Sequence, residues 1–195
     1  MRIGARILFT LQLLACAAGS LLLPAAAAAA DKPYTGPFIE NEDFLVVLKP
    51  RTPEQMAAFY EARGFPPRAI ERIRQTCFVT VHIKNKSGTV LWLDRKNWRF
   101  SSNDKELPRL DKAYWDTVWD EIGLPQANRS TFGWTQLPDV RDLQPNEPVG
   151  GNVVLPGTTE SFNIDAHFLT GKDQRAGMRV IKFENIQCPR DTAAP

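Results

Sequence analysis

Residues 77–94 have the sequence CFVTVHIKNKSGTVLWLD, and this stretch does most to decide the fold class. Residues 77–84 alternate in polarity, which is the pattern of a β-strand with one face toward a core. The apolar face of this strand consists of Cys77, Val79, Val81 and Ile83. Residues 85–88 are typical turn residues, and residues 89–94 predict a return strand. The stretch therefore predicts a β-hairpin.

Further strands are expected on both sides of this hairpin. The pattern predicts them at residues 43–49, where Pro50 should end the strand, around Trp98 and Phe100, and at 152–155, 161–169 and 178–188. Gly150-Gly151 is expected to form a turn before the strand at 152–155. The last strand changes its apolar face near its end, which predicts a bulge at Glu184 or Asn185. About seven short strands separated by turns predict an antiparallel β-sandwich.

Residues 143–188 give this sandwich a more specific likeness. They begin with LQPNEPVGGNVVLP and continue with an alternating strand, a glycine-bounded turn and a final strand. This order resembles the ending of secreted immunoglobulin-like accessory domains. The resemblance implies an immunoglobulin-like β-sandwich. It implies no particular function, because one fold hosts many functions.

Helices are expected beside the strands. Residues 52–55 can form a capping box with proline at the first helical position, so a helix should run from here to Gly64. A second short helix should follow from Pro66-Pro67 to Arg74. Residues 110–122 predict one inserted amphipathic helix, because apolar residues recur at helical spacing at Trp115, Val118, Trp119 and Ile122. Residues 126–148 are expected to form a long irregular connection.

The first thirty residues indicate export. Arg2 and Arg6 precede a long uncharged, apolar stretch, and Ala28 and Ala30 fit the small-residue pattern of signal peptidase cleavage. We therefore expect cleavage near Ala30.

Two other interpretations of this segment stay open. Leu13-Leu14-Ala15-Cys16 resembles a bacterial lipobox, in which Cys16 would be lipidated and would attach the protein to the inner or outer membrane. The apolar stretch is also long enough to remain as an uncleaved membrane anchor. All three interpretations place residues 31–195 in an extracytoplasmic compartment, most simply the periplasm.

Residues 31–195 are expected to form a single globular domain. Its parts would be a flexible lead-in at 31–42, a strand and two helices at 43–76, the β-sandwich at 77–188 and a tail at 189–195. Hydrophobic residues make up 43% of the chain and charged residues 24%, which is ordinary for a globular protein. Beyond Arg2 and Arg6, basic and acidic residues are equal in number, which argues against nucleic acid as a partner.

Cys77 and Cys188 are the only cysteines after Cys16. In an oxidising compartment they can form one disulfide, which would tie the first strong strand pattern to the end of the last strand. Closing so long a loop stabilises a fold by about 4–5 kcal/mol. The alternatives are two separate buried thiols or a reactive thiol. A zinc site is not favoured, because the sequence has no C-x-x-C motif.

Few residues suggest catalysis or a metal. The two histidines, His82 and His167, are expected on outward strand faces, and Asp165 shares the face of His167. If the two strands were neighbours in register, these three side chains could hold zinc, copper or iron. No G-x-S-x-G nucleophile motif or phosphate-binding loop is present. We therefore expect no catalytic residues and no cofactor.

The tryptophans are more informative. Trp115 and Trp119 lie on one face of the predicted helix at 110–122, and Trp134 follows it. Such a stripe is usually core, but Trp115, Trp119 and Trp134 could also form a ligand surface for a glycan or peptide.

The sequence favours an exported, non-catalytic binding or assembly module. Its partner would be a protein or polymer of the cell envelope, and contact with the membrane would come only through a lipid or the anchor. The alternatives are a metal-dependent or hydrolytic envelope enzyme using His82, His167 and Asp165, and a small glycan or peptide binder using the tryptophans.

Overall fold

The computed structural model describes residues 36–158 and 160–191. The expected signal peptide, its cleavage near Ala30 and the lipidation site Cys16 lie outside these residues. Among the described residues, no helix has the length and apolar character needed to span a membrane.

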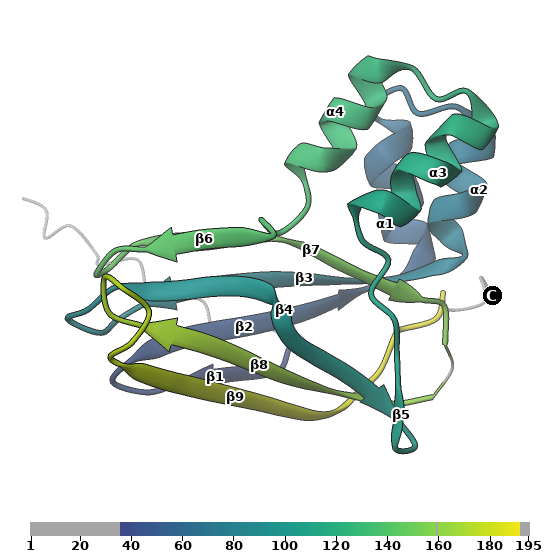
Figure 1. The fold of residues 1–195 in the computed structure, drawn as a ribbon. Coiled ribbons are helices and arrows are strands. Elements are labelled where there is room, and N and C mark those ends of the chain that lie inside the picture. The colour runs from purple at the N-terminus through teal and green to yellow at the C-terminus, as the bar shows by residue number, and fades with distance from the viewer. Residues whose placement is uncertain (1–35, 159, 192–195) are drawn as a thin grey trace, which may run out of the picture. The chain divides into compact units, whose positions relative to one another are not determined.

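The described part of the chain is mainly β, with two antiparallel sheets and four helices. One sheet, here sheet A, has the strand order β1-β2-β3-β7, with β1 at Phe38–Glu40, β2 at Phe44–Arg51, β3 at Thr76–Asn85 and β7 at Pro148–Pro156. The other, sheet B, contains β4 at Leu91–Ser102, β5 at Lys105–Glu106, β6 at Val140–Leu143, β8 at Phe162–Thr170 and β9 at Gly177–Ile186. Its order is β5-β4-β8-β9, with β6 also paired to β4. The two sheets form a β-sandwich (Figure 1).

The predicted hairpin at residues 77–94 is wrong. Both strands form, but β3 pairs with β2 and β7, whereas β4 pairs with strands of the other sheet. The turn between them therefore carries the chain from one sheet to the other. The buried side chain of Asn85 holds this arch, because its Nδ2 donates to the carbonyls of Thr89 at 2.8 Å and Leu143 at 2.9 Å. Leu143 belongs to β6, so the bond that fixes the turn comes from a distant segment.

The sandwich interior is built as the alternating strands predict. Cys77, Val79, Val81 and Ile83 of β3 point inward, as do Phe162, Ile164, Ala166 and Phe168 of β8. The bulge predicted in β9 is confirmed, because the register between β8 and β9 shifts and Asn185 has a positive φ of 56°.

Cys77 and Cys188 are bonded to each other, which confirms the predicted disulfide. Their Cα atoms are 5.6 Å apart and 111 positions apart in the sequence. Cys77 is buried among the interior residues and Cys188 packs against them. The bond therefore ties β3 of sheet A to the segment after β9.

Several segments differ from the sequence-based expectation. The lead-in contains β1, and β2 continues through Pro50 to Arg51, so the sandwich extends back to Phe38. Among the described residues, β1 pairs with β2 only at residues 45–47, so the missing N–H of Pro50 costs no ladder bond to β1.

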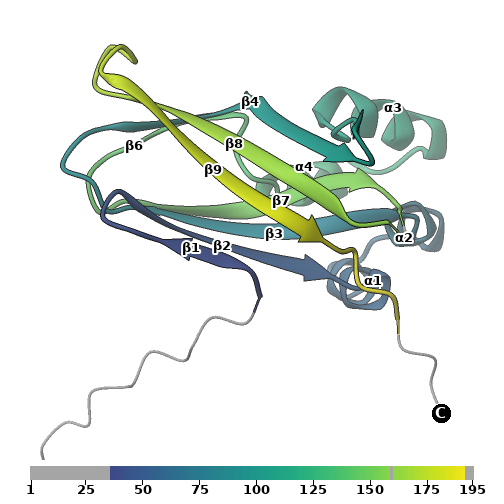
Figure 2. The ribbon, with the colours of Figure 1, turned by 90° about the horizontal axis from the view of Figure 1, so that it is seen from below.

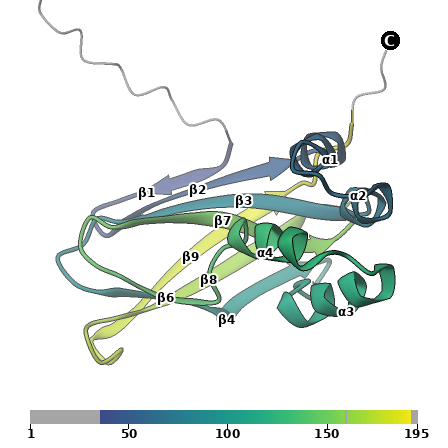
Figure 3. The ribbon, with the colours of Figure 1, turned by 90° about the horizontal axis from the view of Figure 1, so that it is seen from above.

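The helices gather at one end of the strands (Figures 1 and 3). They are α1 at Pro53–Glu61, α2 at Pro67–Arg74, α3 at Lys112–Ile122 and α4 at Gln126–Trp134. The predicted capping box at Thr52 and Gln55 is present at the start of α1. Figure 2 shows the molecule from below, with β8 and β9 nearest the viewer. The helices lie farther from the viewer, at one end of the strands.

A second core joins the helices to the outer face of sheet A. It contains aromatic and aliphatic residues of all four helices, including Tyr60, Trp115, Trp119 and Phe132. Phe78 of β3 and Val154 of β7 belong to it, and both alternate with residues that face the sandwich interior. We call this group the helical cluster.

The helix α4 corrects the expectation of an irregular connection at 126–148. Two helices are therefore inserted between β5 and β6, where one was expected. Residues 126–134 have weak apolar periodicity, and the helix is held by tertiary contacts: Phe132 is 3% exposed and its ring lies 4.7 Å from Trp115. Tertiary packing here outweighs a weak local signal.

Gly151 fixes how the chain leaves α4. The pair Gly150-Gly151 lies inside β7, not in a turn before a strand. Residues 135–137 cross β7 at this point, because Asn152 N–H donates to Thr135 at 2.9 Å and Leu137 N–H donates to Asn152 at 3.0 Å. A Cβ on Gly151 would lie 2.3 Å from the backbone nitrogen of Leu137, so only glycine allows this approach.

Candidate functional site

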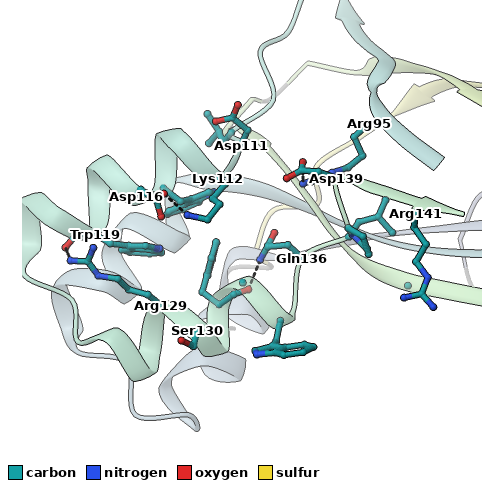
Figure 4. Close-up of a pocket in the computed structure, with 18 of the residues that line it drawn as sticks. Arg95, Asp111, Lys112, Asp116, Trp119, Arg129, Ser130, Gln136, Asp139 and Arg141 are labelled. Atoms are coloured by element: carbon teal, nitrogen blue, oxygen red, sulfur yellow. Dashed lines mark hydrogen bonds and ion pairs between the residues drawn. The ribbon is translucent and has the colours of Figure 1, made fainter. Parts of the chain in front are cut away.

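A cavity of about 820 Å³ lies beside α3, α4 and the segment that follows α4. Its volume is within the range of small-molecule sites, roughly 300–1,000 Å³. Figure 4 shows Trp119 and Arg129 at the helical end of the cavity, and Arg95, Asp139 and Arg141 toward the sheets. We call it the main cavity.

Arg129 ties α4 to the end of α3. This residue of α4 donates from Nε to the carbonyl of Leu124 at 2.8 Å and from Nη2 to that of Trp119 at 3.0 Å. Its Nη1 also pairs with Asp120 at 2.5 Å. These carbonyls lie at and just after the C-terminal end of α3, where a positive charge is favourable. Arg129 therefore holds one wall of the main cavity in place.

The start of α3 is also fixed by a cavity residue. Asp111 is the N-cap and accepts from the backbone N–H of Tyr114 at 3.1 Å. At the other end, Gly123 has φ 65°, the left-handed conformation of a helix C-cap. Both ends of the helix are thus defined by local sequence.

The floor of the cavity is aromatic. Trp115 and Trp119 are one helical turn apart and stack with ring centroids 4.7 Å apart. Phe132 packs on both, at 4.7 Å from Trp115 and 5.1 Å from Trp119. All three are nearly buried, so only their edges line the cavity. The Nε1 of Trp115 is buried and has no hydrogen-bond partner among the described residues.

The opposite end of the cavity contains a buried arginine. Arg95 lies at the irregularity in β4 between Leu93 and Trp98, and only 6% of its surface is exposed. It forms an ion pair with Asp139, and its backbone N–H donates to the Asp139 carbonyl at 2.9 Å. Burial lowers the pKa of Arg95, and the nearby Asp139 carboxylate partly opposes this effect. Its Nε is another buried donor with no partner in the described part of the chain.

A smaller cavity of about 380 Å³ adjoins the main one. Trp134 and Gly150 line both cavities. A polar chain crosses its wall, because Arg51 Nε donates to Thr80 Oγ1 at 3.0 Å and Thr80 donates to Asn152 Oδ1 at 2.8 Å. Trp134 is 89% exposed and lies at the last position of α4.

The structure does not bring the proposed metal ligands together. His82 lies on β3 opposite Val47 and Gly150, whereas His167 and Asp165 lie on β8 opposite Val180 and Lys182. The two strands belong to different sheets, so the pairing that this site needed does not occur. Among the described residues, no group of three or more His, Cys, Asp or Glu side chains could hold a metal ion.

The three tryptophans of the proposed ligand surface have different positions. Trp115 and Trp119 are 3% and 1% exposed and belong to the helical cluster, as the core interpretation expects. Trp134 is almost fully exposed at the rim of both cavities. Sequence reasoning missed Arg95, Arg129 and Gln136 in the cavity wall, because their positions depend on the unrecognised helix α4 and on strand pairing.

Comparison with family models and with curated proteins gives no match. A solved structure from Bacillus subtilis subsp. subtilis, described as a "putative lipoprotein (ycdA)", aligns with a TM-score of 0.43 and 11% identity. The alignment covers 77% of this chain and 39% of that one, so the chain spans about two fifths of the length of the Bacillus protein. A likeness at this level does not establish a shared fold or function.

Proposed function

We propose that this protein is an exported, non-catalytic binding module of the cell envelope, built on an immunoglobulin-like β-sandwich, and that the main cavity is its binding site. The carrying observation is a cavity of about 820 Å³ with an aromatic floor and a polar wall. Its size and composition are those of ligand sites.

Binding is favoured over catalysis by the way the cavity's carboxylates are used. Asp116 pairs with Lys112 at 2.5 Å, Asp120 with Arg129 at 2.5 Å, and Asp139 with Arg95. Asp111 caps α3. A general acid or base has to reach the substrate's proton, whereas these groups are occupied in positioning the wall.

Export is supported by the disulfide and by the first thirty residues. Disulfides persist in oxidising compartments and are rare in the cytosol. We propose that the chain is cleaved near Ala30 and acts in the periplasm, with lipidation at Cys16 as the alternative form. Intact-mass measurement of protein recovered from the envelope distinguishes a chain beginning at Asp31 from one beginning at a lipidated Cys16. A full-length chain with two free thiols at positions 77 and 188 would contradict export.

The binding role is tested with two matched glycine variants. Gly133 lines the main cavity and Gly88 lies in the turn between β3 and β4, and in both cases the space around an added Cβ is open. Gly133→Phe should fill the cavity mouth without disturbing the fold, whereas Gly88→Phe adds the same side chain elsewhere. Sedimentation with an envelope fraction from the producing organism should retain wild-type protein and Gly88→Phe but release Gly133→Phe. Equal sedimentation of all three proteins, or of none, overturns the proposed site.

A further inference from the structure

The two cavities meet at Trp134 and Gly150, which line both of them. We propose that together they form one track for an uncharged oligosaccharide chain, with one sugar ring stacked on Trp134 and further units in the cavities on either side. This inference rests on the proposed function, since it names the ligand class of the same site. Volumes of about 820 and 380 Å³ both fall within the range of ligand sites.

The charges around the main cavity favour an uncharged ligand. Its four positively charged wall residues all lie in ion pairs: Arg95 with Asp139, Lys112 with Asp116, Arg129 with Asp120, and Arg141 with Glu147. No unpaired positive charge is therefore available there to attract an anion, and the remaining wall carboxylate, Asp111, caps α3. An ion pair instead presents donors and acceptors side by side, and a sugar hydroxyl can both donate and accept.

Two buried donors in the wall favour an oxygen-rich ligand over a hydrocarbon. The Nε1 of Trp115 and the Nε of Arg95 have no acceptor among the described residues. Both residues line the main cavity. Buried donors without partners are costly and uncommon. Both nitrogens are covered by the wall, so a ligand hydroxyl group pairs with them only after a small shift of these side chains, whereas an apolar ligand offers no acceptor at all.

Trp134 provides the stacking surface. It is 89% exposed, although a large aromatic side chain is normally covered. One face of a pyranose ring carries mainly C–H groups, and it can pack on the flat indole while the hydroxyl groups at the ring edge stay in contact with polar side chains. Thr80 and Asn152 lie in the wall of the smaller cavity beside Trp134, and the hydrogen bonds of their side chains hold them in place.

The edge of β7 argues against an extended peptide in the same track. Asn152 directs its backbone groups toward the crossing segment, where they pair with Thr135 and Leu137. Since alternate residues of a strand face the same edge, Pro148 and Gly150 face this edge as well. Proline has no N–H, so Gly150 alone offers both a donor and an acceptor. One residue is too short for a peptide to pair as an added strand.

The test uses uncharged oligosaccharides of defined length, namely the chitin, cellulose and maltose series from one to six units. Calorimetric titration of the purified chain should show affinity rising from the monosaccharide and levelling off once both cavities are filled. Trp134→Ala should weaken binding by about tenfold or more, and Trp134→Tyr should keep much of it, because the flat ring is retained. Met178, on β9, is also an exposed apolar residue, and Met178→Ala should bind as tightly as wild type.

Salt and peptide controls decide the ligand class. Affinity for an uncharged sugar should change by less than about twofold between roughly 0.05 and 0.5 M NaCl. If no oligosaccharide of the three series binds, or if Trp134→Ala binds as tightly as wild type, the sugar track is overturned. Trp134-dependent binding of uncharged peptides in place of sugars also overturns it. In each of these cases, the sedimentation test with Gly133→Phe decides whether the proposed function stands. If Gly133→Phe is still released from the envelope fraction while wild type is retained, the proposed function stands. If the two proteins sediment equally, the sugar track and the proposed function are both overturned.

Discussion

The sandwich interior and the helical cluster are both buried hydrophobic cores, but they are held together in different ways. In the sandwich, two sheets fix their own registers through backbone ladders, and a disulfide joins β3 to the segment after β9. The helical cluster has no shared ladder. Its helices are held by ring contacts around Phe132 and by the arginine that caps α3.

This difference explains where the cavities lie. Ladders bring neighbouring strands to about 4.8 Å, and the two inner faces of a sandwich interdigitate fully. Helices that meet through a few large rings leave gaps along their sides, and such gaps become binding sites. The sandwich thus supplies stability, and the helical cluster supplies the surface on which a ligand can be recognised.

The most severe test of the helical cluster is removal of its central ring. Trp119 is 1% exposed and contacts Trp115, Phe65 and Phe132. Trp119→Ala should lower the free energy of unfolding by about 3–5 kcal/mol, because it leaves a large cavity in an aromatic core. Urea unfolding followed by circular dichroism measures this loss. Trp134→Ala should change stability by no more than about 0.5 kcal/mol, and equal losses in the two variants would show that the cluster is not a core.

The disulfide tests the sandwich in the same way. Replacing both Cys77 and Cys188 by alanine should lower the free energy of unfolding by about 2–5 kcal/mol, because the unfolded chain is no longer constrained; the loop-closure value forms the upper end of this range. Urea unfolding with and without a reductant provides the control. The reductant should destabilise wild-type protein and leave the double variant unchanged. If ligand binding by the folded double variant fell together with its stability, the division between a stabilising sandwich and a recognising cluster would be wrong.

The two regions also differ in how far sequence predicts them. Alternation identified the inward faces of β3 and β8, and caps and spacing identified α1, α2 and α3, because these signals are local. Strand partners are not local. Residues 85–88 look like a hairpin turn, yet they belong to an arch between sheets, because Asn85 bonds to a carbonyl of β6.

The cavity could not be predicted from the sequence for the same reason. Three of its features depend on contacts between distant segments: the helix α4, the close crossing at Gly151 and the burial of Arg95. Helical spacing placed Trp115 and Trp119 in a stripe that is usually core, but nothing in the sequence showed that Trp134 would be the exposed member of the three.

The arch at Asn85 provides a smaller test of how the sandwich is closed. Its side chain makes two donor bonds and accepts from the backbone N–H and hydroxyl of Ser87 at 3.0 and 2.7 Å. Asn85→Ala should destabilise by about 1–3 kcal/mol, because it removes the side-chain donor to the buried carbonyl of Leu143. Ser87→Ala removes fewer bonds and should cost less in the same urea measurement. The reverse order would show that the local turn, not the bond to β6, holds the arch.

At neutral pH, the smallest effect on the free energy of unfolding is expected from ionisation of the Tyr60 hydroxyl, a polar group inside the helical cluster. Burial raises the pKa of Tyr60 to about 12, above its ordinary value of 10.0, although hydrogen bonds to Thr135 and Gln136 partly oppose the shift. The hydroxyl lies 2.6 Å from Thr135 Oγ1, at the segment that crosses β7.

The sign of the resulting pH dependence follows from proton binding. Above pH 10 the unfolded chain loses the Tyr60 proton while the folded chain keeps it, so the free energy of unfolding falls as pH rises toward 12. The contribution is complete below pH 10 and declines above it by up to about 1.4 kcal/mol per pH unit. Tyr60→Phe removes this titration, so its stability should fall less steeply over the same range, whereas Tyr114→Phe, at an exposed tyrosine, should follow wild type. Parallel curves for wild type and Tyr60→Phe would mean that burial does not shift the pKa of Tyr60. The helical cluster would then not be a closed core like the sandwich interior, and its contrast with the open cavities beside it would fail.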